Sequence, residues 1–84
     1  MPFTPDLVDE LNLLARFDLA SPQQGLKIHT TAAPEVVAAA QRLHRKGLLT
    51  QVDGGYLTSL GRDAAENAHA ALTILGSLPM TAHE

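Results

Sequence analysis

The chain has 84 residues, which leaves room for one small domain and excludes a second. Apolar residues make up 45% of it and aromatic residues only 4%, so alanine and leucine dominate and favour a core of closely packed helices. The net charge of −3 argues against indiscriminate binding to nucleic acid or anionic membranes, and the absence of cysteine excludes disulfides and thiolate metal sites.

The first predicted helix begins after Thr4. Threonine followed by Pro5 is typical of an N-cap and a first helical residue, and Asp6 favours the positive end of the helix dipole. Apolar residues then recur at helical spacing on more than one face, at Leu7, Val8, Leu11, Leu13, Leu14, Ala15 and Phe17. A helix that is apolar over so wide an arc is expected to contact both its own core and a second subunit.

A second, short helix is predicted to begin at Ser21. In the run Ser21-Pro22-Gln23-Gln24, the last residue is placed to return a hydrogen bond to the backbone of the first, as in a capping box. The helix is expected to continue through Leu26 and Ile28. It should end at two threonines, because β-branched side chains weaken a helix and hydroxyl groups can cap the next one.

A third helix is predicted over residues 34–46, with Pro34 in its first turn and Gly47 as the residue that ends it. One apolar stripe, Val36, Ala40 and Leu43, is expected to face the core. The other positions are expected to project elsewhere, and they form a face that is small at its start and basic at its end: Ala38, Ala39, Gln41, Arg42, Arg45 and Lys46.

A β-hairpin and a fourth helix complete the predicted domain. Strands over residues 48–52 and 56–57 are joined by Asp53-Gly54-Gly55, since Asp-Gly between β-compatible runs is a strong hairpin signal. Thr58 can cap the fourth helix, which is expected to end within residues 76–79. The domain then covers residues 1–78, and residues 79–84 are a flexible tail. The fourth helix has the apolar stripe Leu60, Ala64, Ala65, Ala68, Leu72 and Leu75.

The predicted fold class is mainly α with a small β-hairpin and about four helices. Two segments, Arg42-Leu43-His44-Arg45-Lys46-Gly47-Leu48-Leu49-Thr50 and Gly54-Gly55-Tyr56-Leu57-Thr58-Ser59-Leu60-Gly61-Arg62, resemble the recognition-helix end, wing and following helix of winged helix-turn-helix domains. In MarR-like regulators this pattern is Leu-x-x-Lys-Gly-Leu, a hairpin, then Leu-Thr-x-x-Gly. The resemblance covers residues 34–66 and implies a winged helix-turn-helix fold. Over its whole length the chain also resembles a family of short uncharacterised proteobacterial proteins, which implies no particular function.

Two features depart from the winged-helix pattern. Lys27 and Thr31 align with positions where a small residue and a turn glycine are common in helix-turn-helix units. The hairpin has no lysine or arginine between Gly47 and Gly61, so it lacks the cation with which many wings enter a minor groove. The third helix is therefore the expected contact with DNA.

Charge is segregated along the chain in a way that favours an anionic partner. Residues 27–62 carry five cations and two anions, a net charge of +3, whereas the remaining residues carry one cation and seven anions. The predicted function is binding to duplex DNA, as a transcriptional regulator or a chromosome-associated protein, through phosphate contacts of the third helix. The expected DNA-binding residues are Lys27, Gln41, Arg42, Arg45 and Lys46.

Two alternatives remain open from the sequence. Arg45 and Lys46 can simply complement the negative end of the helix dipole. The chain can also be a protein-interaction module, in which a winged-helix frame does not bind nucleic acid and its acidic first and fourth helices contact a partner. Affinity for duplex that falls steeply with salt would distinguish a DNA-binding protein from such a module.

Catalysis is not predicted, because no nucleophile, base and orienting residue stand at a motif spacing. No pair among the four histidines has metal-binding spacing, so no metal or other cofactor is expected, and His44 is expected to pack against the core. No stretch approaches the roughly 20 apolar residues that span a bilayer, and no leader-like segment is recognisable, so a cytoplasmic location is expected. A domain this small is expected to be a homodimer through its first and fourth helices.

Overall fold

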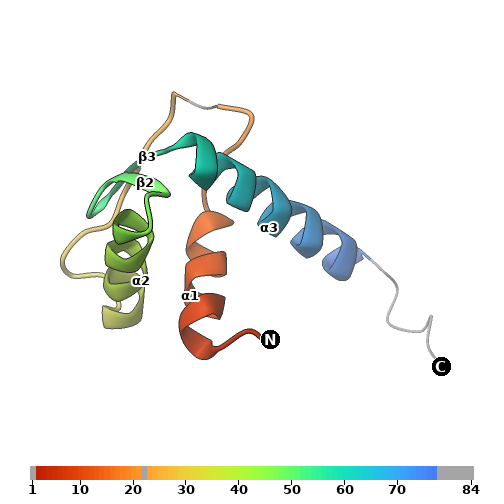
Figure 1. The fold of residues 1–84 in the computed structure, drawn as a ribbon, viewed down its shortest axis with the longest axis horizontal. Coiled ribbons are helices and arrows are strands. Elements are labelled where there is room, and N and C mark those ends of the chain that lie inside the picture. The colour runs from red at the N-terminus through yellow and green to blue at the C-terminus, as the bar shows by residue number, and fades with distance from the viewer. Residues whose placement is uncertain (1, 22, 78–84) are drawn as a thin grey trace.

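The computed structural model describes residues 2–21 and 23–77 of the chain. α1 and α2 lie side by side, the sheet lies at the C-terminal end of α2, and α3 passes the end of α1 and projects beyond the rest of the domain (Figure 1). The fold is mainly helical, as predicted, but the described residues form three helices instead of four. The elements are α1 (Pro5–Leu14), β1 (Leu26–Lys27), α2 (Pro34–Arg45), β2 (Leu49–Gln51), β3 (Gly54–Leu57) and α3 (Ser59–Ser77).

The three strands form an antiparallel sheet in the order β1-β3-β2, so that β3 is central. β1 pairs Leu26 with Gly55, and β2 pairs Leu49 with Leu57. An order of helix, strand, helix, hairpin and helix with this sheet topology is compatible with a winged-helix fold.

α1 begins as its sequence predicts. The Thr4 side chain accepts a hydrogen bond from the N–H of Leu7 at 3.2 Å, and Pro5 is the first helical residue, where its missing N–H costs nothing. The C-terminal part of the helix is inserted in the core through Leu13 and Leu14, which are 2% and 3% exposed. The capping signal and the apolar spacing thus identified this helix correctly.

The predicted short helix beginning at Ser21 is wrong. Residues 23–33 contain no helix, and the segment instead forms β1. Ile28, directly after β1, is only 5% exposed and its N–H donates to the carbonyl of Asp53 at 2.8 Å. Pairing with β3 and burial of this isoleucine outweigh the local capping signal, because strand formation depends on partners that are distant in sequence.

α2 matches the predicted helix to within one residue at its C-terminal end. Gly47 has a φ of 84°, the left-handed conformation that glycine adopts without steric cost. The N–H of Leu48 donates to the carbonyl of Leu43 at 2.9 Å, and the N–H of Gly47 donates to the carbonyl of His44 at 3.0 Å. These two bonds are those of a Schellman motif, which ends the helix and starts the hairpin.

The inward face of α2 is wider than predicted. Ala39 is predicted to project away from the core, yet it is fully buried together with Ala40. Ala39 shares a helix face with Arg42 and Lys46, whose side chains contact α1. α2 is therefore covered by α1 on a face that the sequence pattern assigns to solvent. His44, in contrast, is exposed and does not pack against the core as predicted.

The hairpin is confirmed, but its glycines lie in a strand. Residues 52–53 form the turn, and Gly54 and Gly55 belong to β3 with φ values of 118° and 72°. A Cβ at Gly54 would lie 2.2 Å from the carbonyl oxygen of Leu26, so only glycine allows β1 to approach β3 here.

α3 is capped by Thr58 as predicted. The Thr58 hydroxyl accepts from the N–H of Gly61 at 3.0 Å and donates to the carbonyl of Gly47 at 2.6 Å, which joins the start of α3 to the end of α2. The predicted tail, residues 79–84, lies outside the described residues. The core combines residues of all three helices with Leu49 of β2 and with two residues outside the helices and strands, Phe17 and Ile28. Its members are Leu13, Leu14, Phe17, Ile28, Ala39, Ala40, Leu43, Leu49, Ala65 and Ala68.

Candidate functional site

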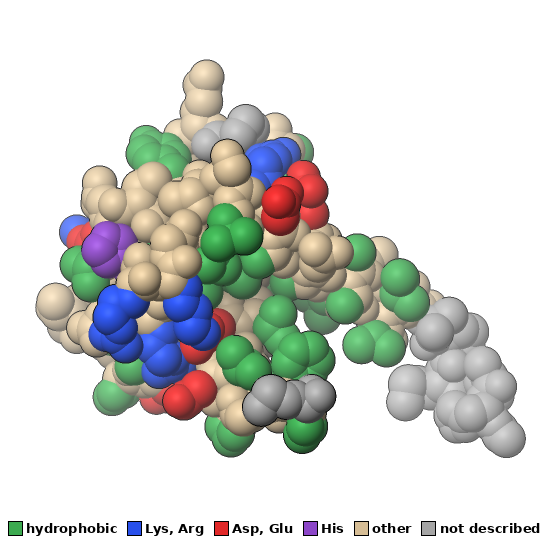
Figure 2. Space-filling view, in the orientation of Figure 1, with side chains coloured by type: hydrophobic (Ala, Val, Ile, Leu, Met, Phe, Trp, Pro, Cys, Tyr) green, Lys and Arg blue, Asp and Glu red, His purple; other side chains and the backbone are tan. Residues whose placement is uncertain are grey.

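The residues predicted to contact DNA are divided between two places. Gln41, Arg42 and Arg45 lie in the second half of α2, with Lys46 directly after it, whereas Lys27 lies on β1. Figure 2 shows lysine and arginine side chains gathered over α2, with acidic side chains beside them. The fold thus brings four of the five predicted residues to one helix end.

Two of these cations are bound by a carboxylate of α1. The Nε of Arg42 donates to Glu10 at 2.6 Å, and the Nζ of Lys46 donates to the other oxygen of the same carboxylate. Arg42 also donates to the backbone carbonyl of Asp6 at 3.2 Å. The Glu10 side chain is only 6% exposed, and the Arg42 side chain only 20%. These contacts of Glu10, Arg42 and Lys46 connect α1 to α2. They also leave little of the Arg42 side chain exposed to solvent.

The pKa values follow from this contact. Burial raises the pKa of Glu10, but hydrogen bonds from Lys46 and Arg42 lower it more, and the result is a pKa below the ordinary value of a glutamate. The hydrogen bond that Arg42 donates to Glu10 raises the pKa of Arg42 above its ordinary value. The Glu10 carboxylate and the Arg42 guanidinium are therefore both charged at neutral pH.

The other three predicted residues are more accessible. Lys27 pairs with Asp53 at 2.5 Å, which joins β1 to the hairpin turn and lowers the pKa of Asp53 through a hydrogen bond. Gln41 and Arg45 are exposed, and neither forms a side-chain hydrogen bond or ion pair with another described residue. Arg45 is consequently the cation of the α2 group whose charge is available to a partner.

Glu10 is a residue that the sequence analysis missed. It occupies a position between Leu7 and Leu14 at spacings of three and four residues, on the stripe that leads to Phe17. A carboxylate on an otherwise apolar helix stripe requires a cation from a neighbouring element. The charged residue within this apolar stripe was the sequence signal that could have identified Glu10 as the partner of a cation.

An apolar groove lies between α1 and α3, where the two helices diverge. Figure 2 shows hydrophobic side chains along this face. The cavity measures about 550 Å³ and is lined by apolar side chains and two exposed asparagines. We call it the α1/α3 groove; its residues are Phe3, Leu11, Asn12, Ala15, Ala64, Asn67, Ala68, Ala71, Leu72 and Leu75.

The second half of α3 forms one wall of this groove and has little else to pack against. All side chains of residues 70–77 are exposed, including Leu72 at 59%, Ile74 at 58% and Leu75 at 73%. Residues 67–77 contain no aspartate, glutamate, lysine or arginine. The alanines of the predicted apolar stripe therefore pack in or against the core, whereas its leucines are exposed to solvent.

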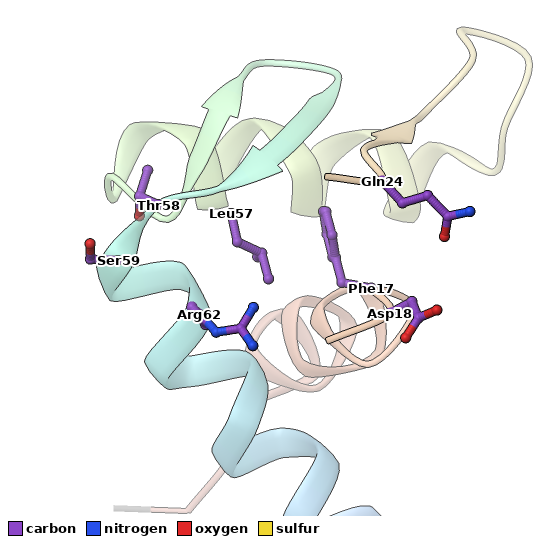
Figure 3. A pocket seen from close by; sticks show the side chains of 7 residues that line it. All are labelled: Phe17, Asp18, Gln24, Leu57, Thr58, Ser59 and Arg62. Atoms are coloured by element: carbon purple, nitrogen blue, oxygen red, sulfur yellow. The ribbon is translucent and has the colours of Figure 1, made fainter. Parts of the chain in front are cut away.

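A second, smaller cavity of about 180 Å³ lies between the end of α1, the sheet and the start of α3. Figure 3 shows Leu57 and Phe17 flanking this space and Arg62 extending into it from α3. Arg62 donates to the carbonyl of Leu19 at 3.0 Å and pairs with Glu66 at 3.3 Å. The guanidinium of Arg62 therefore already has partners within the chain. We assign this cavity a structural role, where the end of α1, the sheet and the start of α3 meet.

Within residues 2–21 and 23–77, no three histidine, aspartate or glutamate side chains are close enough to hold a metal ion. His83 lies outside that part of the chain. None of the helices in the described ranges has the length and apolar character needed to cross a bilayer.

A family match covers most of the chain. The model of a family of unknown function, DUF5669, matches residues 1–76. Neither the curated proteins nor the solved structures contain a match to the chain.

Proposed function

Since the chain belongs to the DUF5669 family, whose function is unknown, we propose from its geometry that it is a protein-interaction module that binds through the α1/α3 groove. The observation that carries this proposal is the groove itself. An apolar concavity of about 550 Å³ lined by exposed leucines is the kind of surface at which proteins contact one another.

The frame of this module is proposed to be a reduced winged helix. α2, the hairpin and β1 correspond to the recognition helix, the wing and the first strand of that fold. The helix that would precede the recognition helix is replaced by residues 28–33, which include a turn closed by the Ala32 N–H and the His29 carbonyl at 2.9 Å. Without that helix, the frame lacks a complete helix-turn-helix unit, which favours protein contact over DNA recognition.

Photo-crosslinking tests the interaction proposal. A photoreactive amino acid at Asn67, an exposed residue that lines the groove, should form covalent adducts with a protein chain in cells that express the protein. The matched control places the same amino acid at Gln51, an exposed residue of β2 away from the groove, and should give no adduct. Equal labelling at both positions, or none at Asn67, would remove the support for this surface.

Binding to duplex DNA is a second candidate, and one observation favours it. Arg45 is exposed without an ion pair to the described residues, and it lies next to Lys46 and within one turn of Arg42. Glu10 binds Arg42 and Lys46, but no carboxylate of the described residues pairs with Arg45, so this helix end keeps a small positive patch centred on Arg45. Gln41 lies beside this patch and can donate hydrogen bonds to phosphate oxygens.

A salt titration with generic duplex tests this candidate. Affinity should fall steeply as salt rises, because phosphate contacts release counterions. Arg45→Ala should weaken binding, whereas Arg16→Ala, which removes an exposed cation at the end of α1, should not. Arg42 is unsuited to this test because it holds Glu10. If the intact protein does not bind duplex at low ionic strength, this candidate fails.

A further inference from the structure

The hairpin turn contains the only aspartate of the sequence that is followed by glycine. Asp53 precedes Gly54, and no asparagine of the sequence is followed by glycine. The carboxyl group of an aspartate can react with the backbone nitrogen of the next residue, and a glycine there has no side chain to shield that nitrogen. The sequence therefore favours backbone isomerisation at Asp53 more than at any other aspartate or asparagine of the chain.

The isomerisation needs no reactant other than water. The backbone nitrogen of Gly54 attacks the protonated carboxyl group of Asp53 at Cγ. A C–N bond forms, and the carboxyl hydroxyl leaves with the amide proton as water. Water then opens the cyclic imide at one of its two carbonyl carbons. Opening at the side-chain carbonyl restores aspartate, whereas opening at the main-chain carbonyl gives isoaspartate, in which the main chain runs through Cβ.

Contacts with β1 hold both residues of this reaction in place. The Asp53 carboxylate accepts a hydrogen bond from the Nζ of Lys27 at 2.5 Å, and the Asp53 backbone carbonyl accepts from the N–H of Ile28 at 2.8 Å. Gly54 is buried directly against β1, where a Cβ would lie 2.2 Å from the carbonyl oxygen of Leu26. Ring closure brings the Asp53 Cγ within bonding distance of the Gly54 nitrogen, and each of these contacts opposes that movement.

Lys27 also affects the reactivity of the carboxyl group. Its hydrogen bond lowers the pKa of Asp53 below the ordinary value of an aspartate. The ionised carboxylate is the unreactive form, because it has no hydroxyl group that can leave as water. The Asp53 side chain is 34% exposed, so water can reach it, and its protection depends on these contacts with β1.

We propose that Asp53 is a site of isoaspartate formation and that Lys27 protects it, so that the modification proceeds when this ion pair opens. The Lys27 side chain is 65% exposed, and ion pairs at such exposure are weak and open readily. Figure 1 shows the hairpin on the side of the domain away from the projecting end of α3, and no residue of the hairpin lines the α1/α3 groove. The modification is therefore independent of the function proposed for that groove.

Isoaspartate at this position would disrupt the sheet. The main chain of the turn becomes one atom longer, and the carbonyl that accepts from Ile28 becomes part of a carboxylate branch. The pairing of Lys27 with Gly54 then loses its register, and Ile28, which is 5% exposed, loses the hydrogen bond that holds it in the core. The modified chain should therefore unfold at a lower temperature than the original.

Incubation of the full chain below its melting temperature, in mildly acidic buffer, tests the proposal. Peptide mapping identifies isoaspartate at residue 53 by a changed elution at unchanged mass, and a carboxyl methyltransferase specific for isoaspartate measures its amount. Lys27→Met should accumulate isoaspartate about two- to fivefold faster than the original, since a surface ion pair shifts an equilibrium by a factor of that size. The matched control, Arg16→Met, removes another exposed cation and should match the original.

Two further measurements separate the chemistry from the fold. A chain with both Lys27→Met and Asp53→Glu should give no product at residue 53, because glutamate would have to close a larger ring that forms slowly. In urea concentrated enough to unfold both proteins, the original and Lys27→Met should form isoaspartate at equal rates. Residues 27 and 53 are in contact only in the folded chain, so the protection should disappear on unfolding.

Three outcomes would overturn the proposal. Equal rates in the folded original and in folded Lys27→Met would remove the protecting role of Lys27. A lack of isoaspartate at residue 53 in both proteins would remove the site itself. An acceleration at Asp18, an exposed aspartate after α1, as large as the one at Asp53 would show that Lys27→Met loosens the whole domain.

Discussion

Glu10 is a buried carboxylate that determines how α1 meets α2. One oxygen accepts from Arg42 at 2.6 Å and the other accepts from Lys46, so a single side chain binds two cations of the neighbouring helix. The cations remain partly exposed, at 20% and 46% of their side chains, and retain some hydration. The contact therefore stabilises the domain without the full desolvation cost of a completely buried ion pair.

We expect the stability of the protein to depend on the charge of Glu10. Because the pKa of this carboxyl is lowered in the folded state, its contribution is present above the ordinary glutamate pKa and is lost as pH falls through the lowered value. Glu10→Gln should reduce the free energy of unfolding by about 1–2 kcal/mol at pH 7. The variant should also lose less stability than the original between pH 5 and pH 3.

Urea denaturation at pH 7, pH 5 and pH 3 measures this effect. Glu66→Gln is the control, because Glu66 is exposed and pairs with Arg62 within α3, and it should change stability little. A Glu10→Gln protein as stable at pH 7 as the original would contradict the role assigned to the carboxylate.

The position of α3 depends on close contact at its first turn. Gly61 is buried, and a Cβ there would lie 2.0 Å from the carbonyl oxygen of Leu48. The start of α3 thus rests directly on the chain segment that follows α2, and the Thr58 hydroxyl bonds to the same region through Gly47. This contact sets the direction in which α3 leaves the domain.

Gly61→Ala should therefore destabilise the protein by about 2 kcal/mol or more, because backbone atoms must move to accommodate the methyl group. Gly76→Ala is the matched control in the same helix. A Cβ at Gly76 meets nothing within 4 Å, so this substitution should be neutral or should stabilise the helix by up to about 1 kcal/mol. Thermal unfolding of the two variants measures the difference. Equal melting temperatures would contradict the proposed contact.

The elements that sequence reasoning predicted correctly are those with local end signals. Thr4 and Thr58 cap their helices, and Gly47 ends α2, because each signal involves residues within a few positions of each other. β1 could not be predicted in the same way. Its two residues are a strand only because β3 lies beside them, and the capping pattern at Ser21 gives no information about that neighbour.

The candidate site shows the same limit. The sequence placed Gln41, Arg42, Arg45 and Lys46 on one helix end, and the structure has them there. It could not show that a carboxylate 32 residues away from Arg42 binds that side chain. Likewise, the periodicity of α3 identified its apolar stripe, but not the point at which the core ends and the groove begins, because that depends on the angle between α1 and α3.

Charged and apolar contact surfaces are separated on the protein. The cations of α2 lie beside the acidic start of α1, and the groove between α1 and α3 contains no charged side chain in its lining. A domain of this size has a thin core, built here largely of alanine and leucine. Burial of the groove would add apolar contacts that the single chain does not supply, and homodimerisation stays a prediction that this argument favours.

The small sheet has a consequence for how the protein behaves at high concentration. β3 has a strand on each side, and the outer strands β1 and β2 contain only two and three residues. Edges this short, next to a strand that starts with two glycines of positive φ, offer a poor template for fibril growth. Crowded solutions should therefore remain free of amyloid, even though almost half of the residues are apolar.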